Sequence, residues 1–269
     1  HPAPDHAARQ TGPSPDAMTE LLRIEGVSKR FGDFAAVNGV TLTIPAGRLT
    51  AIIGPNGAGK TTLINLATGA LFPDSGVMHF KGEAITHLAT HHRIHKGLSR
   101  SFQIMNIFPR LSVLQNVLVP VLSRRGRAGA PFSGVEGERE AVTEAQQILR
   151  EIGLLDEENA PAGALSHGDQ RLLELGIAIA PLPELCFLDE PSAGLTPIER
   201  ATVLELIRRL STERHTTFVI VEHDMDVVFS LADWIIVMNR GQVLAEGSPA
   251  EIRENRAVRE VYLGEELSA

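Results

Sequence analysis

A glycine-rich loop with the spacing G-x-x-x-x-G-K-[ST] occupies residues 54–61, which read GPNGAGKT. Its glycines allow backbone N–H groups to turn inward around a phosphate, Lys60 adds a positive charge at the β- and γ-phosphates, and the Thr61 hydroxyl can ligate Mg²⁺. An apolar, β-branched run at residues 49–53 precedes the loop and helical spacing follows it, so we predict a strand, the loop and a helix in that order. The predicted nucleotide site comprises Gly54, Pro55, Asn56, Gly57, Ala58, Gly59, Lys60, Thr61 and Thr62.

Two acids lie at the end of another apolar run, where residues 185–190 read LCFLDE. A buried parallel strand delivers such acids to its carboxyl edge. Asp189 is then placed to hold a Mg²⁺ shell, and Glu190 to orient or deprotonate the water that attacks a γ-phosphate. The alternative is a solvated strand end without a chemical role. Beside the phosphate loop, the two acids favour nucleotide hydrolysis.

Further residues have chemistry that suits a phosphate site. The Ser166 hydroxyl and the Gly168 N–H, in the string LSHGDQ at residues 165–170, begin a predicted helix and form a second anion-binding element. The Gln103 amide could complete the Mg²⁺ or water shell. The His223 imidazole could donate to a γ-phosphate oxygen, where transition-state charge accumulates. Taken singly, Gln103 and His223 are better explained as ordinary core or loop residues, and it is their order along the chain with the other motifs that favours a functional role.

The joint order of these motifs resembles that of the ATP-binding subunits of ABC transporters. The LSHGDQ string is similar to their LSGGQ signature, and residues 193–196 (AGLT) stand where the family has its D-loop. SRSFQ places Gln103 at the Q-loop, and VIVEHDM places His223 at the H-loop. Phe31 falls where the family stacks an aromatic ring on adenine. The resemblance covers nearly the whole chain.

Three positions depart from the family pattern. His167 replaces a glycine, Asp169 replaces a glutamine, and Thr196 stands where the D-loop commonly ends in aspartate. Ser166 and Gly168 keep the phosphate-facing types. The Asp169 carboxylate is expected either to point away from the phosphates or to contact the helix N-terminus. The resemblance implies that this element, formed by Ser166, His167, Gly168 and Asp169, serves the ATP of a partner subunit.

The fold that the resemblance implies is an α/β P-loop NTPase of the ABC ATPase type, with a parallel-sheet core, an antiparallel β subdomain and a helical subdomain. We expect one domain over residues 18–269, with the helical subdomain at about 98–165 and a C-terminal family extension at about 240–269. Residues 1–17 are polar and rich in proline, and are expected to be a disordered leader or an expression remnant upstream of Met18.

Patterns of alternation and helical spacing predict the other elements. Strands are expected at residues 21–29, 36–44 and 77–81, with turns at Asn38-Gly39 and at residues 45–47. Helices are expected at residues 111–122, 138–152, 166–180, 197–210 and 224–231. A helix at His91, His92 and His95 could present two imidazoles to a metal, but no third ligand is evident and we interpret it as a solvated helix.

Composition indicates a cytosolic globular enzyme, with 43% hydrophobic residues and a net charge of −8. That charge disfavours broad binding to nucleic acid, which depends on Lys and Arg. No apolar run approaches the roughly 18 residues that span a bilayer, so any membrane role is expected to come through a partner. The lone Cys186 suits a buried residue in a reducing compartment.

The C-terminal string YLGEE and the region around Gln103 resemble the ATPases of branched-chain amino-acid importers, and EHDM resembles the LivG-like one of their two ATPase subunits. This implies a peripheral subunit at the cytoplasmic face of the inner or plasma membrane that uses ATP and Mg²⁺. Its expected partners are integral-membrane permease subunits, a second ATPase subunit in a homodimer or heterodimer and, indirectly, a solute-binding protein. Residues 98–117, with Ile107 and Arg110, are expected to line the permease-docking groove. Urea or amide importers, lipopolysaccharide exporters and a soluble non-transport ABC ATPase remain alternatives.

Overall fold

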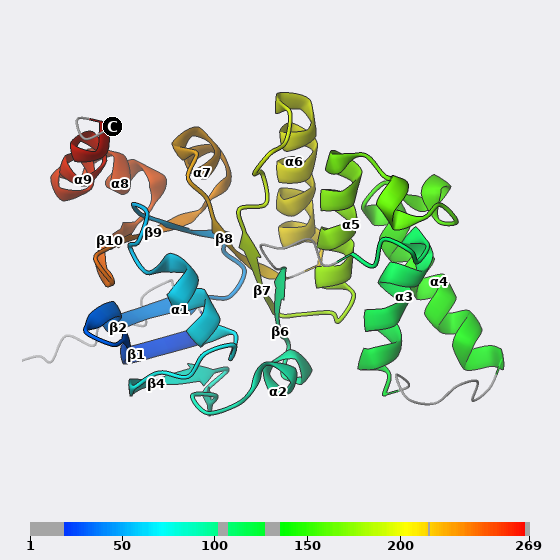
Figure 1. The fold of residues 1–269 in the computed structure, drawn as a ribbon, viewed down its shortest axis with the longest axis horizontal. Helices are drawn as coiled ribbons and strands as arrows, with labels where there is room; N and C mark the ends of the chain where they lie inside the picture. The colour runs from blue at the N-terminus through cyan, green and yellow to red at the C-terminus, as the bar shows by residue number, and fades with distance from the viewer. Residues whose placement is uncertain (1–18, 102–106, 127–134, 215, 267–269) are drawn as a thin grey trace, which may run out of the picture.

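The computed structural model describes residues 19–101, 107–126, 135–214 and 216–266 (Figure 1). Gln103 and the leader at residues 1–17 lie outside these ranges. Within the described ranges, none of the helices is both long and apolar enough to cross a bilayer.

A six-stranded sheet forms the centre of the molecule, in the order β10-β9-β3-β8-β7-β6. Its strands are β3 (Thr50–Ile53), β6 (Leu98–Ser101), β7 (Leu185–Asp189), β8 (Thr217–Val221), β9 (Trp234–Asn239) and β10 (Gln242–Gly247). All neighbours pair in parallel except β10, which runs antiparallel to β9. The predicted parallel core is therefore confirmed, with one antiparallel edge strand. Because β6 belongs to this sheet, residues 98–101 are part of the core and the helices of the helical part begin at Val113.

Both faces of the central strands are buried, and successive side chains enter different hydrophobic clusters. In β7, Cys186 and Leu188 pack with the helices of one face, whereas Leu185 and Phe187 pack toward the second sheet. Strand side chains alternate between faces, so a strand covered on both sides reads as a continuous apolar run. This explains why the run before Asp189 has no polar residue.

A second, antiparallel sheet has the order β2-β1-β4-β5, with β1 (Glu20–Phe31), β2 (Phe34–Pro45), β4 (Ser75–Phe80) and β5 (Glu83–Ala84). This confirms the predicted antiparallel subdomain and the turn at residues 45–47. The turn at Asn38-Gly39 is wrong, because both residues lie inside β2. Gly39 has φ +63°, and the pairing of β1 with β2 shifts register beside it. A glycine in a left-handed conformation here makes a bulge that keeps the strand continuous.

The helices surround the central sheet, and Figure 1 shows α3 and α4 at one end of the molecule and α8 and α9 at the other. The helices are α1 (Lys60–Ala67), α2 (Thr90–His95), α3 (Val113–Arg124), α4 (Val135–Glu151), α5 (His167–Ile179), α6 (Pro197–Glu213), α7 (Met225–Leu231), α8 (Pro249–Glu254) and α9 (Arg256–Glu266). Helical spacing predicted α3 to α7 with ends within about one turn. Helix α1 packs between the two sheets, which fixes the loop before it.

A buried arginine stabilises the C-terminal end of α1. The Arg93 guanidinium, on α2, has no exposed surface and donates to the carbonyls of Leu66 and Ala67, each at 2.7 Å. These carbonyls lie in the last turn of α1, where carbonyls have no partner within the helix. The Leu66 carbonyl also accepts from the N–H of Gly69 at 3.3 Å, so Arg93 adds a charged donor to it. Burial lowers the pKa of Arg93 to about 10, so it stays charged at neutral pH. The neighbouring His91 and His92 are exposed, as expected of a solvated helix.

Candidate nucleotide-binding site

The phosphate loop connects β3 to α1, as the sequence predicts. Two of its glycines approach neighbouring backbone so closely that no side chain fits. A Cβ on Gly54 would lie 2.1 Å from the Met238 carbonyl oxygen, and one on Gly59 would lie 2.2 Å from the Ala36 carbonyl oxygen. Gly59 also has φ +97° and is the N-cap of α1. The loop is thus held between β9 and β2 in a conformation that only glycine permits.

Lys60 is buried at the start of α1, with 6% of its surface exposed. Its Nζ donates to the carbonyl oxygens of Gly54 at 2.6 Å and Pro55 at 3.0 Å. The ammonium therefore lies over the concave side of its own loop, where it satisfies backbone carbonyls. A phosphate in this loop would offer the same charge stronger acceptors.

One cavity of about 260 Å³ brings most of the predicted site together. Glu190 from the end of β7 and His223 from the end of β8 face the phosphate loop across it. Since β7 and β8 are parallel neighbours, their carboxyl ends meet at the same edge of the sheet. The residues that line the cavity are Phe34, Ala36, Asn56, Gly57, Ala58, Gly59, Lys60, Thr61, Thr62, Glu190, Val221 and His223.

Glu190 has a strained backbone and a fixed side chain. Its φ is +49°, in the left-handed region that non-glycine residues rarely adopt. Its N–H donates to the Val221 carbonyl at 2.9 Å, and its Oε1 lies 2.8 Å from Nε2 of His223 in a hydrogen bond. These contacts turn the chain at the end of β7 and hold the carboxylate at the mouth of the loop.

Asp189 is buried with 3% exposure and pairs with an arginine that the sequence did not single out. Arg100, from the neighbouring strand β6, donates to Oδ2 of Asp189 at 3.1 Å and also to Oδ1 of Asn65 on α1. Burial raises the pKa of Asp189, and Arg100 opposes that rise. Arg100 thus joins β6, β7 and α1 at one point under the loop.

Two of the three residues predicted to hold Mg²⁺, Asp189 and Thr61, fit such an ion. Among the described residues, Oδ1 of the Asp189 carboxylate has no hydrogen-bond partner although it is buried. A buried carboxylate oxygen without a partner is costly unless a cation or an ordered water meets it. Thr61 supplies a hydroxyl in the adjoining cavity. Oxygen ligands of this kind, completed by water and phosphate, are those that Mg²⁺ prefers.

The two phenylalanines near the loop have different positions. Phe31 ends β1 and Phe34 begins β2, and they face each other across the hairpin. Both are exposed, at 50% and 60%, but it is Phe34 that lines the cavity beside the loop. The sequence prediction assigned the adenine-stacking ring to Phe31. Phe34, three residues later, was not considered, because only the hairpin register shows which ring faces the loop.

The signature segment begins helix α5, with Ser166 as its N-cap. Ser166 Oγ accepts from the backbone N–H of Asp169 at 3.1 Å and donates to Oδ2 of Asp169 at 2.7 Å. The Asp169 carboxylate thus contacts the helix N-terminus, one of the two arrangements expected from the sequence. Gly168 N–H donates to Oε1 of Glu199 at 3.2 Å. Cavity and signature are separate in this chain, because none of these residues lines the cavity.

Glu222, the residue before His223, is a buried acid that sequence reasoning passed over. It is 4% exposed, and its Oε1 accepts from the backbone N–H of Ser192 at 3.0 Å. Burial raises its pKa. This bond ties the end of β8 to the segment that follows Glu190.

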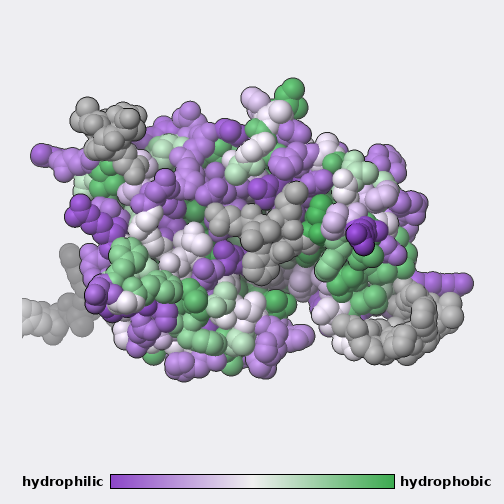
Figure 2. Space-filling view, in the orientation of Figure 1, coloured by the Kyte–Doolittle hydropathy of each residue, from purple (hydrophilic) through white to green (hydrophobic). Residues whose placement is uncertain are grey.

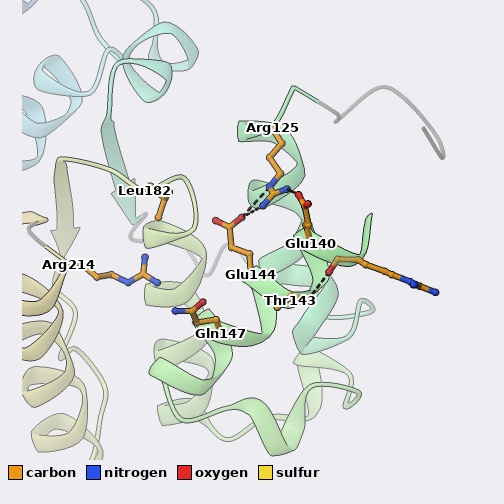
Figure 3. Close-up of a pocket in the computed structure, with 8 residues that line it drawn as sticks. Arg125, Glu140, Thr143, Glu144, Gln147, Leu182 and Arg214 are labelled. Atoms are coloured by element: carbon orange, nitrogen blue, oxygen red, sulfur yellow. Dashed lines mark hydrogen bonds and ion pairs between the residues drawn. The ribbon is translucent and has the colours of Figure 1, made fainter. Parts of the chain in front are cut away.

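A second cavity, of about 560 Å³, lies where α3 and α4 meet the ends of α5 and α6. Figure 3 shows Leu182 and Arg214 on one side and Arg125, Glu144 and Gln147 on the other. Arg125 pairs with Glu144 at 2.9 Å. Leu182, after α5, is 49% exposed. The cavity therefore offers both charges and an apolar edge.

Comparisons with known proteins agree with these features. The chain matches the family described as "ABC transporter" over residues 37–193 and the family described as "Branched-chain amino acid ATP-binding cassette transporter" over residues 242–268. The high-affinity branched-chain amino acid transport ATP-binding protein BraF of Pseudomonas aeruginosa is 39% identical over 250 residues, with 91% of this chain and 98% of BraF covered. Its counterpart LivG of Escherichia coli is 38% identical over 252 residues, with 91% and 98% covered.

Solved structures show the same likeness. A structure of an ABC-transporter ATP-binding cassette in its ADP conformation has a TM-score of 0.80 and 34% identity, and covers 91% of this chain and 99% of that one. The fold, the converging motifs and these relatives lead to one conclusion: the chain belongs to the ABC transporter ATPases, in the branched-chain amino-acid type represented by BraF and LivG.

Proposed function

We propose that this chain hydrolyses ATP with Mg²⁺ to energise the import of branched-chain amino acids or a related small solute. The observation that carries the proposal is the single cavity in which Glu190 and His223 face the phosphate loop. Acid, imidazole and loop lie far apart in sequence, and the parallel order of β3, β8 and β7 brings them together.

Glu190 is the proposed base for the attacking water. Its carboxylate is 28% exposed at the mouth of the cavity, so water reaches it, and His223 fixes its direction through the 2.8 Å bond. With a γ-phosphate in the loop, His223 is also in position to donate to the charge that develops on the phosphate oxygens. Lys60 would exchange its two carbonyl acceptors for β- and γ-phosphate oxygens.

Asp189 and Thr61 would hold Mg²⁺, with Gln103 as the third proposed contact. When bound, the ion neutralises charge on the β- and γ-phosphates. The Arg100 pair keeps Oδ2 of Asp189 occupied and leaves Oδ1 for the metal shell.

The signature is proposed to contact ATP bound by a second subunit, in a head-to-tail dimer. Two observations support this arrangement: Ser166 and Gly168 do not line the chain's own cavity, and a dimeric cassette structure bound to ADP and Pi resembles this chain with a TM-score of 0.72 and 25% identity. That structure covers 85% of this chain and 99% of its own.

We further propose that membrane-embedded permease subunits dock beside the helical part, at the cytoplasmic face of the membrane. Exposed apolar side chains lie here, with Phe108 at 54% and Val119 at 45%, and Figure 2 shows hydrophobic side chains gathered beside α3. Arg110 is exposed in the same segment.

Reconstitution tests this function. The chain, a second ATPase subunit and cognate permeases in liposomes should take up a branched-chain amino acid in an ATP-dependent manner, and Arg110→Glu should reduce uptake while basal ATPase activity stays near wild type. Steady ATP hydrolysis by a chain that never associates with permeases would instead support a soluble ABC ATPase.

A further inference from the structure

The two signature donors expected to meet a partner's phosphate are already engaged by carboxylates of the same chain. Ser166 Oγ–H donates to Asp169 at 2.7 Å, and Gly168 N–H donates to Glu199 at 3.2 Å. The first acceptor comes from the signature itself and the second from α6, 31 residues away from Gly168. Both acceptors are carboxylate oxygens and carry negative charge, as phosphate oxygens do.

Glu199 links two helix starts through its two oxygens. Oε2 accepts from the N–H of Thr196 at 2.9 Å and from its hydroxyl at 2.8 Å, which closes a capping box at the start of α6. Oε1 accepts from Gly168 at the start of α5. The Thr196 hydrogen bonds, followed by that of Gly168, lower the pKa of Glu199, which keeps the carboxylate ionised at neutral pH.

Glycine at position 168 lets Glu199 approach this closely, because a side chain there would push the glutamate away. A Cβ there would lie 2.8 Å from both Cγ and Oε1 of Glu199. The chain offers an internal comparison at α8, where Ser248 and Glu251 close the same kind of box, with bonds of 2.7 Å and a proline at the first helical position. Figure 1 shows α8 near the C-terminal end, remote from α5. A capping box can therefore form without a bond to the signature, so capping of α6 does not by itself explain the hydrogen bond between Glu199 and Gly168.

We propose that Glu199 and Asp169 are positioning residues that act as internal substitutes for the partner's γ-phosphate, so that formation of the ATP dimer requires a carboxylate-for-phosphate exchange at Ser166 and Gly168. This inference rests on the proposed head-to-tail dimer. In the separate subunit, the two carboxylates satisfy the donors at the α5 N-terminus. An incoming phosphate must displace acceptors that already occupy the same donors and must approach two negative charges.

Conservative amides separate this role from a structural one. Glu199→Gln keeps the size of the side chain and a residue type that closes capping boxes. Its single carbonyl oxygen can serve Thr196 or Gly168 but not both, and it carries no charge. Asp169→Asn likewise removes the charge that faces Ser166. Glu251→Gln makes the same substitution in the box that does not touch the signature.

The test measures the ATP concentration that half-saturates dimer formation in full-length chains that also carry Glu190→Gln, by sedimentation with MgATP. The exchange predicts that Glu199→Gln and Asp169→Asn each lower this concentration by about tenfold, equivalent to about 1.4 kcal/mol, whereas Glu251→Gln leaves it unchanged. Thermal melting of the separate subunits, without nucleotide, checks that each variant is folded.

Three outcomes overturn the inference in distinguishable ways. An unchanged or higher ATP requirement in folded Glu199→Gln and Asp169→Asn variants would show that the carboxylates only stabilise the helix starts. An equal shift in Glu251→Gln would show a general effect of lost charge. If chains with Glu190→Gln alone bind ATP without ever forming a dimer, the head-to-tail dimer itself is wrong, and the exchange is wrong with it.

Discussion

Replacing Arg100 with methionine should strongly destabilise this chain. The Arg100 side chain is 7% exposed and that of its partner Asp189 is 1% exposed. Methionine would fill much of the space but leave the carboxylate buried without its cation. Removing one partner of a buried pair costs about 3–5 kcal/mol, because the remaining charge is uncompensated. We expect a loss of that size in urea unfolding without nucleotide.

A double-mutant cycle with Asp189→Asn isolates the pair. Each single variant should lose stability, and the double variant should lose less than the sum of the two, because no unpaired charge remains. Arg256→Met is the matched control, since Arg256 pairs with Glu260 at a site where the side chains are 92% and 64% exposed. Such a surface pair contributes about 0.5 kcal/mol or less. If Arg100→Met costs no more than Arg256→Met, or if the Arg100 and Asp189 effects are simply additive, the described role of Arg100 is wrong.

Three further predictions address the nucleotide and the fold. Phe34→Ala should weaken binding of a fluorescent ATP analogue more than Phe31→Ala, by about fivefold to tenfold if the ring stacks on the base; the reverse order would return the role to Phe31. Arg93→Leu should lower the free energy of unfolding by about 3 kcal/mol or more, because the carbonyls of Leu66, Ala67 and Thr86 lose their charged donor, and a loss under 1 kcal/mol in urea would contradict this. Glu222→Gln should gain stability relative to wild type as the pH rises from 4 to 7: the raised pKa of Glu222 means that the unfolded state ionises first, so the wild type loses stability over this range and the amide does not. If the difference in unfolding free energy between Glu222→Gln and wild type does not change with pH, the folded state does not raise the pKa of Glu222.

Local patterns predicted the parts of the site that lie within one element. The glycine loop between β3 and α1 and the two acids at the end of β7 follow from side-chain types and short spacing, and the apolar runs identified the central strands. The ordered motifs then indicated the family. Asn38-Gly39 was misread because the same dipeptide serves a hairpin turn or a bulge, and strand pairing decides between them.

Contacts between distant elements could not be predicted. Arg100 meets Asp189 across 89 positions of sequence, and Glu199 meets Gly168 across 31, so both pairs depend on how strands and helices pack. Phe34 reaches the cavity through the register of the hairpin between β1 and β2. The types and spacing of residues within one element do not indicate which residues of another element they will contact. The role of Gln103 stays a prediction, since the residue lies outside the described ranges.

The most direct test of the central claim compares ATP binding and ATP turnover in Glu190→Gln. The amide keeps the shape of the side chain that meets His223 at 2.8 Å, but it cannot accept a proton from water. We predict that ATP affinity stays within a few-fold of wild type in the presence of Mg²⁺, while turnover falls by about 10²–10⁴-fold and an ATP-bound dimer accumulates. Hydrolysis by folded Glu190→Gln at a rate near that of the wild type would contradict the assignment of Glu190 as the base.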